Sequence, residues 1–414
     1  MRPFAHRKIE ERPSTDMLLR DFLICILQMT VAHALVIPGD MKFAVMVDAG
    51  SSGSRVYVYT WRDGGGLKTP ELLRDEFGEP VVKKVSPGLS SFAKHPKDAK
   101  QHIADLLDFA KGAIPKASLT GTHVYVFATA GMRLLPIKEQ CLIWRHVRSE
   151  IRNRYPFKFA NTDARTISGD DEALFGWIAV NYLLHRFGLE EYSKKKKSTY
   201  GMLDLGGASM QVAFELGGYG TKNSTNIFPL SLRTKSNDDD ESSIQSYDLF
   251  LHSYLSYGAN VMRKRHEEVL LYDYLPPWAD PEKPVTIRDP CLQKGLTINA
   301  TLSPRKPNET EEPRKREVEK EYQVQFFGGG DPDKCKVLVR ELVLGGEMGR
   351  EPAPPIWFEM PFYGLSEFFY ALEGVSSKEI YVYSEAVAKI DELCKRPWDE
   401  YTKILRGQYG DEET

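Results

Sequence analysis

Short apolar segments rich in Val, Ile, Tyr and Phe alternate with segments of helical periodicity along most of the chain. Segments of the first kind predict strands at residues 43–47, 56–61, 123–128, 201–205 and 210–216. Apolar residues recur at helical spacing in two stretches between them: Ile103, Leu106, Leu107 and Ala110, then Leu174, Trp177, Ile178 and Tyr182. Both stretches predict helices with one face on a core. Alternating strands and helices are typical of an α/β fold.

One apolar run lies outside this alternation, near the N-terminus: FLICILQMTVAHALVIP, residues 22–38. Basic residues precede it, among them Arg7, Lys8, Arg12 and Arg20. The combination resembles a signal peptide or a signal anchor that would attach the protein to a membrane. The run is at the lower end of the length that spans a bilayer, so a buried N-terminal helix is the alternative.

Three triplets fit the acceptor pattern for N-glycosylation, and they begin at Asn223, Asn299 and Asn308. Together with the leader they favour a lumenal location in the secretory pathway. Glycosylation at these three positions is therefore a prediction.

Composition and charge narrow the range of functions. A chain of 414 residues, 42% hydrophobic and 27% charged, is long enough for two or three packed domains. Its net charge of -3 supplies no global basic field, which argues against nucleic-acid binding. An anionic ligand must therefore be bound locally.

Five cysteines are present, and they differ in context. Cys25 lies in the leader. Cys141 opens an apolar helical pattern with Leu142, Trp144 and Val147, which predicts a buried free thiol. Cys291 and Cys335 flank a polar insertion and are the best candidate pair in an oxidising lumen, where closing the loop contributes about 3 to 4 kcal/mol. Cys394 is left over.

A strand–turn–strand pattern occurs twice. VMVDAGSSGSRVYVY at 45–59 is echoed by GMLDLGGASMQVAFE at 201–215. Backbone N–H groups in a Gly/Ser turn can converge on phosphate oxygens, and the carboxylates of Asp48 and Asp204 can hold Mg²⁺ or Ca²⁺. Either turn alone is explained as well by a plain hairpin. Two copies instead favour duplicated domains that face one phosphate-binding cleft.

Two further motifs carry candidate chemistry. FATAGMRLLP, 127–136, follows a predicted strand and places Thr129, Ala130 and Gly131 where α/β sheets bind ligands, although a helix start capped by Thr129 is an equal alternative. In ISGDDEALFGWIAVNYLL, 167–184, Ser168 and Asp171 form a predicted capping box. Glu172 projects from the same helix turn and is a candidate general base for an attacking water.

The ordered motifs DAGSSGSR, ATAGMR, SGDDEALFGW and DLGGASMQ resemble the signature regions of the nucleoside triphosphate diphosphohydrolases, the apyrase family. Further matches are YDLFLHSYLSYGANVMRKR, DPCLQKG, GGGDPDKC and FYGLSEFFY. The resemblance covers about residues 43–400 and is greatest to the intracellular Golgi and lysosomal members.

This family belongs to the actin, Hsp70 and sugar-kinase superfamily. The resemblance therefore implies two RNase H-like α/β domains with the active site in the cleft between them. The expected division is an N-terminal tail at 1–40, a phosphate-binding domain I at 41–166, and a domain II at 167–414 that holds the second phosphate turn and the nucleobase site.

The resemblance also implies roles for individual residues. Glu172 matches the general base, and Ser209 and Gln211 match the residues that hold the nucleophilic water in line. Asp48 and Asp204 match the carboxylates that bind Ca²⁺ or Mg²⁺ through its waters. The phosphate-contacting positions are Ser51, Ser52, Gly53, Ser54, Thr129, Ala130, Gly207 and Ala208.

Other family features fall on the second half of the chain. Tyr363, Phe369 and Tyr370 are candidates for stacking on the nucleobase, with a buried aromatic cluster as the alternative. Cys291 and Cys335 fall where the family has a disulfide. The family pattern continues well beyond CKRPWDEY and supplies a partner for the cysteine at 394, so we expect the C-terminal end of the fold to be missing.

The leading hypothesis is divalent-metal-dependent hydrolysis of nucleoside di- or triphosphates, with UDP or GDP favoured, in the Golgi lumen or membrane; lysosomal and extracellular sites are alternatives. Hydrolysis of polyphosphate or guanosine pentaphosphate, or a sugar-kinase activity, is a second hypothesis, which SGDDEALFGW and GANVMRKR argue against. A truncated chain that binds nucleotide without turnover is the third.

Overall fold

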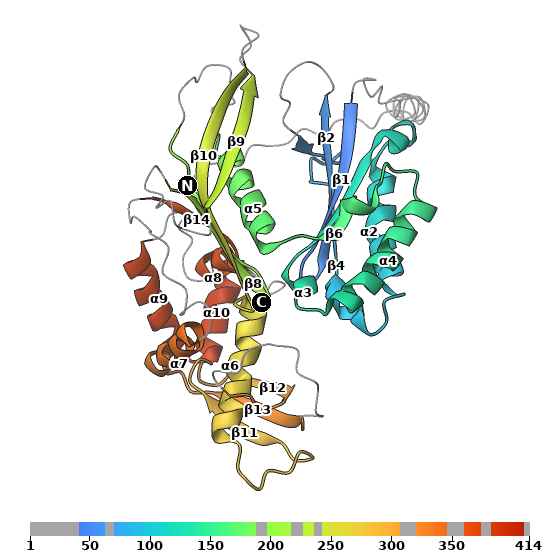
Figure 1. The fold of residues 1–414 in the computed structure, drawn as a ribbon. Coiled ribbons are helices and arrows are strands. Elements are labelled where there is room, and N and C mark those ends of the chain that lie inside the picture. The colour runs from blue at the N-terminus through green and yellow to red at the C-terminus, as the bar shows by residue number, and fades with distance from the viewer. Residues whose placement is uncertain are drawn as a thin grey trace, which may run out of the picture.

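The computed structural model describes residues 41–62, 70–187, 197–216, 227–235, 242–306, 320–345, 360–373 and 382–409, which form three β-sheets with associated helices (Figure 1). The leader at 22–38, Asn223 and Asn308 lie outside these ranges. Within them, no helix combines the length and apolar character that a membrane crossing requires. Asn299 is exposed on a strand.

The first sheet contains six strands in the order β3-β2-β1-β5-β6, with β4 paired to β2. Its strands are β1 (Met41–Ala49), β2 (Ser54–Arg62), β3 (Glu71–Leu72), β4 (Val82–Val85), β5 (His123–Ala128) and β6 (Ala164–Thr166). β1 pairs antiparallel with β2 and parallel with β5. Val45, Val47, Val56 and Val58 alternate with more exposed residues and are fully buried, as the pattern of each strand predicts.

Helices cover the face of this sheet on which those valines lie (Figure 1). They are α2 (Ala99–Ala113) and α4 (Ile137–Arg154), with the short α3 (Ala130–Arg133) and the 3-10 segments η1 (Leu89–Ala93), η2 (Lys116–Gly121) and η3 (Asn161–Asp163). Ile103, Leu106 and Leu107 of α2 belong to the same buried cluster, which confirms the predicted helix stripe.

The second sheet has the order β14-β7-β8-β10-β9. Its strands are β7 (Gly201–Leu205), β8 (Ser209–Glu215), β9 (Ile227–Lys235), β10 (Ser242–Leu255) and β14 (Phe362–Ser366). Helix α5 (Gly169–Leu183) packs on it through Trp177, which is fully buried against the rings of Phe187 and Tyr247. On its other side, Phe175 of α5 stacks on Phe127 of β5 at 6.3 Å between ring centroids. Helix α5 therefore contacts both sheets.

The remaining elements form a third, smaller unit and a helical C-terminal part. The third sheet, in the order β11-β13-β12, consists of β11 (Val285–Asp289), β12 (Thr297–Leu302) and β13 (Tyr322–Gly328). The helices are α6 (Ala259–Tyr274), α7 (Pro332–Leu344), α8 (Glu367–Glu373), α9 (Tyr383–Lys395) and α10 (Trp398–Tyr409). Leu270 and Leu271 of α6 share a core with Phe326 of β13.

Candidate active site

Three small-residue turns meet around Ser51. A Cβ atom added at Gly207, in the second repeat, would lie 2.6 Å from Ser51 Oγ, and one added at Gly131 would lie 2.8 Å from Ser51 Cα. The turns at 48–54, 129–133 and 204–209 come from different parts of the chain, so the fold brings together motifs that the sequence only places in order. Such close backbone approach requires glycine.

Two further glycines let neighbouring segments support these turns. A Cβ at Gly88 would lie 2.3 Å from the carbonyl oxygen of Ser51. At Gly258, the N-cap of α6, a Cβ would lie 2.2 Å from the amide nitrogen of Ala208. The turns at 48–54 and 204–209 are therefore each backed by a closely packed loop or helix start.

Thr129 and Ser54 show how the remaining turn residues are used. Thr129 precedes α3 as its N-cap, but its side chain makes no capping hydrogen bond, so helix capping does not account for the hydroxyl. Ser54 is fully buried at the start of β2, and its Oγ lies 2.8 Å from His102 Nε2. The Ser54 side chain thus packs behind the turn, so the predicted phosphate contact at this position would be made by its backbone.

Glu172 lies in a network of polar side chains. Its Oε2 accepts a hydrogen bond from Arg133 Nη2 at 2.7 Å and lies 3.2 Å from Gln211 Nε2. Arg133 Nη2 also donates to Ser209 Oγ at 3.2 Å. Gln211 Nε2 lies 2.6 Å from Ser209 Oγ and 2.8 Å from Ser253 Oγ. The structure therefore brings together the three residues predicted to act on the water.

The start of α5 fixes the position of Glu172. Ser168 caps this helix: Asp171 N donates to Ser168 Oγ at 3.0 Å, and Ser168 N donates to Asp171 Oδ2 at 3.4 Å, which confirms the predicted capping box. Gly169 allows close approach to β10, since a Cβ there would lie 2.3 Å from Cβ of Ser253. Ser168 and Asp171 are thus structural, which leaves Glu172 for chemistry.

Three partly buried carboxylates, those of Glu172, Asp48 and Asp204, are close enough to affect one another electrostatically. Burial raises the pKa of Glu172 to about 7, although Arg133 opposes the rise and Asp204 and Asp48 add to it. Burial also raises the pKa of Asp48, with Arg55 opposing and Asp204 adding. Each carboxylate would be stabilised by a nearby cation.

Asp204 is suited to bind a cation for a second reason besides its raised pKa. Burial raises its pKa against a hydrogen bond from Ser366, and its Oδ1 atom is buried without a hydrogen-bond partner among the described residues. A buried carboxylate oxygen without a partner is costly, and oxygen atoms of this kind are what Mg²⁺ and Ca²⁺ prefer. Asp48 and Asp204 are therefore suited to hold a divalent cation.

The nucleobase candidates lie on β14 and α8. Tyr363, Phe369 and Tyr370 are 47%, 54% and 59% exposed, so the alternative of a buried aromatic cluster is wrong. The rings of Phe369 and Tyr370 meet edge to face. Tyr370 also lies near enough to Tyr57 of β2 to contribute to a raised pKa of Tyr57, which is caused mainly by burial.

Sequence reasoning missed four residues of this site. Arg133 and Ser253 form hydrogen bonds with the predicted catalytic side chains. Ser366 forms a hydrogen bond with the Asp204 carboxylate, and His102 lies behind the turn at 48–54. Arg133 stands in the quoted motif ATAGMR, which was the available signal. Its partners are distant in the chain, so only the fold reveals its role.

The cysteines gave one confirmed and one wrong prediction. Cys291 and Cys335 form a disulfide, as expected. Cys141 is a free thiol, but it is exposed rather than buried. The buried side of α4 consists of Gln140, Ile143, Trp144, Val147 and Ile151, and Cys141 lies off that stripe.

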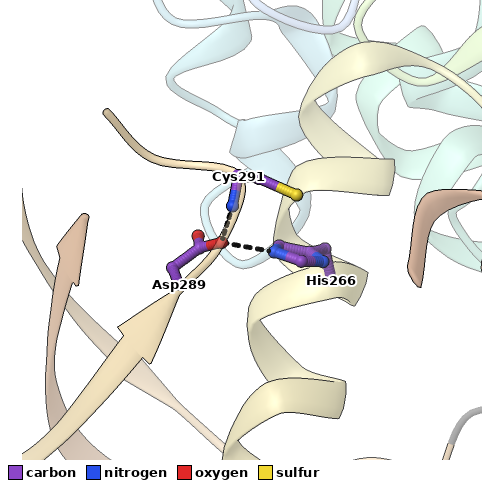
Figure 2. Close-up of side chains that lie close together, drawn as sticks. All are labelled: His266, Asp289 and Cys291. Atoms are coloured by element: carbon purple, nitrogen blue, oxygen red, sulfur yellow. Dashed lines mark hydrogen bonds and ion pairs between the residues drawn. The ribbon is translucent and has the colours of Figure 1, made fainter. Parts of the chain in front are cut away.

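A second cluster has the residue types of a metal site. His266 Nε2 lies 2.9 Å from Asp289 Oδ1, which also accepts from Cys291 N at 2.8 Å (Figure 2). The Cys291 sulfur is bonded to Cys335, so it is no thiolate ligand. Burial opposes the ionised Asp289, yet hydrogen bonds from His266 and Cys291 and the charge of Arg263 lower the pKa of Asp289. We interpret the cluster as structural.

Residues 35–413 match the GDA1/CD39 (nucleoside phosphatase) family, and the chain belongs to this family. Nucleoside-triphosphatase ntp-1 of Caenorhabditis elegans is 31% identical over 386 residues, which is 90% of this chain and 63% of the relative. Golgi apyrase of Schizosaccharomyces pombe is 33% identical over 383 residues, 86% of this chain and 60% of the relative. The chain therefore spans less than two thirds of either relative.

A solved nucleoside triphosphate hydrolase from Neospora caninum is similar in fold. It has 18% sequence identity and a TM-score of 0.55, covering 92% of this chain and 83% of the solved one. This likeness confirms the predicted α/β fold.

Proposed function

We propose that the protein hydrolyses the terminal phosphate of nucleoside di- or triphosphates in a reaction that depends on a divalent cation. The observation that carries the proposal is the network in which Glu172 contacts Arg133 and Gln211 beside the two aspartates. A carboxylate whose pKa is about 7 is suited to accept a proton at neutral pH. Membership of a nucleoside phosphatase family supports the substrate class.

The reaction we infer is direct attack by water. Ser209 and Gln211 orient the water, Glu172 accepts its proton, and the water oxygen forms the new bond to the terminal phosphorus as the bridging P–O bond breaks. The turns around Ser51 and Gly207 bind the phosphate oxygens through backbone N–H groups. Asp48 and Asp204 would hold Ca²⁺ or Mg²⁺, which would supply charge neutralisation. No covalent nucleophile is required.

We place substrate and location by analogy. UDP and GDP are the favoured substrates, Tyr363, Phe369 and Tyr370 are candidates for stacking on the base, and the Golgi is the favoured compartment, because a relative is named a Golgi apyrase. The leader at 22–38 is a candidate membrane anchor.

The test measures phosphate release by the full chain from a panel of nucleotides with Mg²⁺, with Ca²⁺ and with EDTA. Glu172→Ala is expected to abolish release, whereas Asp170→Ala, which removes an exposed carboxylate from the same helix turn, leaves it intact. Full activity in Glu172→Ala, or in EDTA, contradicts the mechanism. A folded wild-type chain that hydrolyses no nucleotide supports the binding-only hypothesis instead.

A further inference from the structure

Helix α4 bears a surface cavity of about 370 Å³, and no residue of the phosphate turns lines it. Its lining residues, here called the arginine pocket, are Cys141, Arg145, Arg148, Ser149, Arg152 and Asn161. The five helical members recur at helical spacing and so share one face of α4, while Ile143 and Val147 on another face pack into the core. The volume lies within the range of small-molecule sites.

The pocket is strongly positive. Three of its six lining residues are arginines and none is acidic, in a chain whose net charge is -3. Like charges spaced along one helix face repel one another, so the cluster is unfavourable without a counter-charge. A bound anion would relieve this repulsion.

Two of the guanidinium groups are already held in place. Arg148 donates from Nε and Nη2 to the carbonyl oxygen of Ala164, at 3.0 and 2.7 Å, and lies over the Trp144 ring. Arg152 donates to the side-chain oxygen of Asn161. Both acceptors are uncharged, so the positive charges are not neutralised. Such preorganisation lowers the entropic cost of binding a ligand.

The third guanidinium, that of Arg145, is available to bind a ligand. Among the residues that the structure describes, Arg145 has no hydrogen bond or ion pair, and it is exposed. A guanidinium presents its donors in a fork that matches phosphate and carboxylate oxygens. Arg145 can therefore turn onto an anion held by Arg148 and Arg152.

We propose that the arginine pocket binds a small molecule bearing at least two oxyanion groups, either phosphates or carboxylates. Binding here needs no divalent cation, because the pocket supplies positive charge directly. The candidate active site differs in this respect, since Asp48 and Asp204 place negative charge beside its phosphate turns. EDTA therefore separates the two sites.

Cys141 provides a local reporter, since it is a free and exposed thiol that lines the pocket. The full chain is treated with iodoacetamide, which is uncharged, in EDTA at constant ionic strength, and modification of Cys141 is followed by peptide mass spectrometry. Added pyrophosphate or citrate is expected to slow modification of Cys141 several-fold at saturation. Cys394, the other free cysteine described, is the internal reference.

The two anions distinguish the ligand class. Protection by pyrophosphate alone assigns phosphate ligands, protection by citrate alone assigns carboxylates, and protection by both assigns oxyanions in general. If neither anion protects Cys141 beyond sodium chloride of equal ionic strength, the proposal is wrong.

Variants test whether the arginines of the pocket bind the anion. Arg145→Gln and Arg152→Gln should each raise the half-protecting anion concentration roughly tenfold, through loss of a charge-assisted hydrogen bond. The matched control is Arg154→Gln, which removes a charge from the same helix where it pairs with Asp108 outside the pocket. Equal weakening in all three variants would indicate general charge screening and overturn the proposal.

Discussion

At the residue scale, the proposed role of Glu172 as a general base has a cost in stability. Its pKa lies at about 7 in the folded protein, against an ordinary value of 4.5. Between these two values the folded protein retains a proton that the unfolded chain has released, so stability falls as pH rises through this window. Above it, the ionised carboxylate costs on the order of 3 kcal/mol in the cation-free protein.

Replacing Glu172 by Gln should therefore stabilise the protein at high pH only. Thermal melts in EDTA at pH 8 should show a higher midpoint for Glu172→Gln than for wild type. The difference should shrink as the pH is lowered and should vanish below about pH 4, where the wild-type carboxyl is protonated in the unfolded chain as well as in the folded protein. A variant that is less stable than wild type at pH 8 would contradict the assigned direction of the pKa shift.

Arg133 affects the pKa of the same carboxylate. It lowers the pKa of Glu172 by charge and by a 2.7 Å hydrogen bond, against the larger effect of burial. Arg133→Gln should therefore move the acid limb of the pH–rate profile to higher pH, and activity on the acid side should fall roughly tenfold for each pH unit that the limb moves. Arg133→Lys retains the charge and should restore part of the profile. An acid limb that stays in place in Arg133→Gln would rule out this coupling.

The residue scale also shows what sequence alone could supply. Glu172, Ser209 and Gln211 were predicted as one catalytic group, and the Gln211 side chain does lie within hydrogen-bond distance of the other two. Arg133 was missed because its contacts depend on α3 meeting both α5 and β8, which no local pattern encodes. The roles themselves remain predictions until turnover is measured.

At the element scale, close packing at the start of α6 supports the second phosphate turn. A Cβ at Gly258 would lie 2.2 to 2.4 Å from backbone atoms of Gly207, Ala208 and Ser209, so the turn must move if the glycine is replaced. Gly258→Ala should lower phosphate release about a hundredfold, since displacement of a catalytic group by about 1 Å has effects of that size.

Gly112→Ala is the matched control for this prediction. Gly112 lies in α2 with open space around it, so alanine there meets no atom within 4 Å and should leave activity unchanged. Equal activity of the two variants would show that the second turn tolerates displacement.

The Cys291–Cys335 disulfide joins the loop after β11 to α7. The two residues are 44 apart in sequence, and closing such a loop is worth about 4 kcal/mol in the loop-entropy model. The double variant Cys291→Ser/Cys335→Ser should lower the stability of the third sheet. Peptides of β11 and β13 should then exchange hydrogen faster than they do in the wild type. Exchange equal to that of wild type would mean that the loop is constrained in the unfolded chain by other means.

Elements differed in how well their patterns predicted them. The strands at 43–47, 56–61, 123–128, 201–205 and 210–216 are confirmed because each carries a buried, β-branched or aromatic run. Strand β12, with the sequence TINATL, lacks that signal, and its place depends on pairing with β13. The helix containing Cys141 was predicted, and its buried face was predicted only in part. Trp144 and Val147 of the expected pattern are buried, whereas Cys141 and Leu142 are exposed.

At the scale of the whole molecule, the candidate site joins two separately packed cores. One buried cluster contains only residues between 43 and 164, and another only residues between 173 and 251. Arg133, which lies beside the first core, donates hydrogen bonds to Glu172 and Ser209, which lie beside the second. The turns of both parts meet at Ser51. The repeat in the sequence predicted that two such parts would share a phosphate site. The sequence did not predict that helix α5, which lies between them, would contact both sheets.

If the proposed function holds, an unreactive nucleoside diphosphate analogue with Mg²⁺ must contact turns from both cores. Its binding should then slow hydrogen exchange in β5 and in β8 together, because opening either core releases the ligand; at about 100 times its Kd the added stability is roughly 2.7 kcal/mol. Peptides of β12, in the third sheet, serve as the control and should exchange unchanged. Protection confined to one core would place the ligand on one phosphate turn only. Asp204→Asn should abolish protection in both cores, since a cation held by both aspartates is what allows the phosphates to approach the two turns at once.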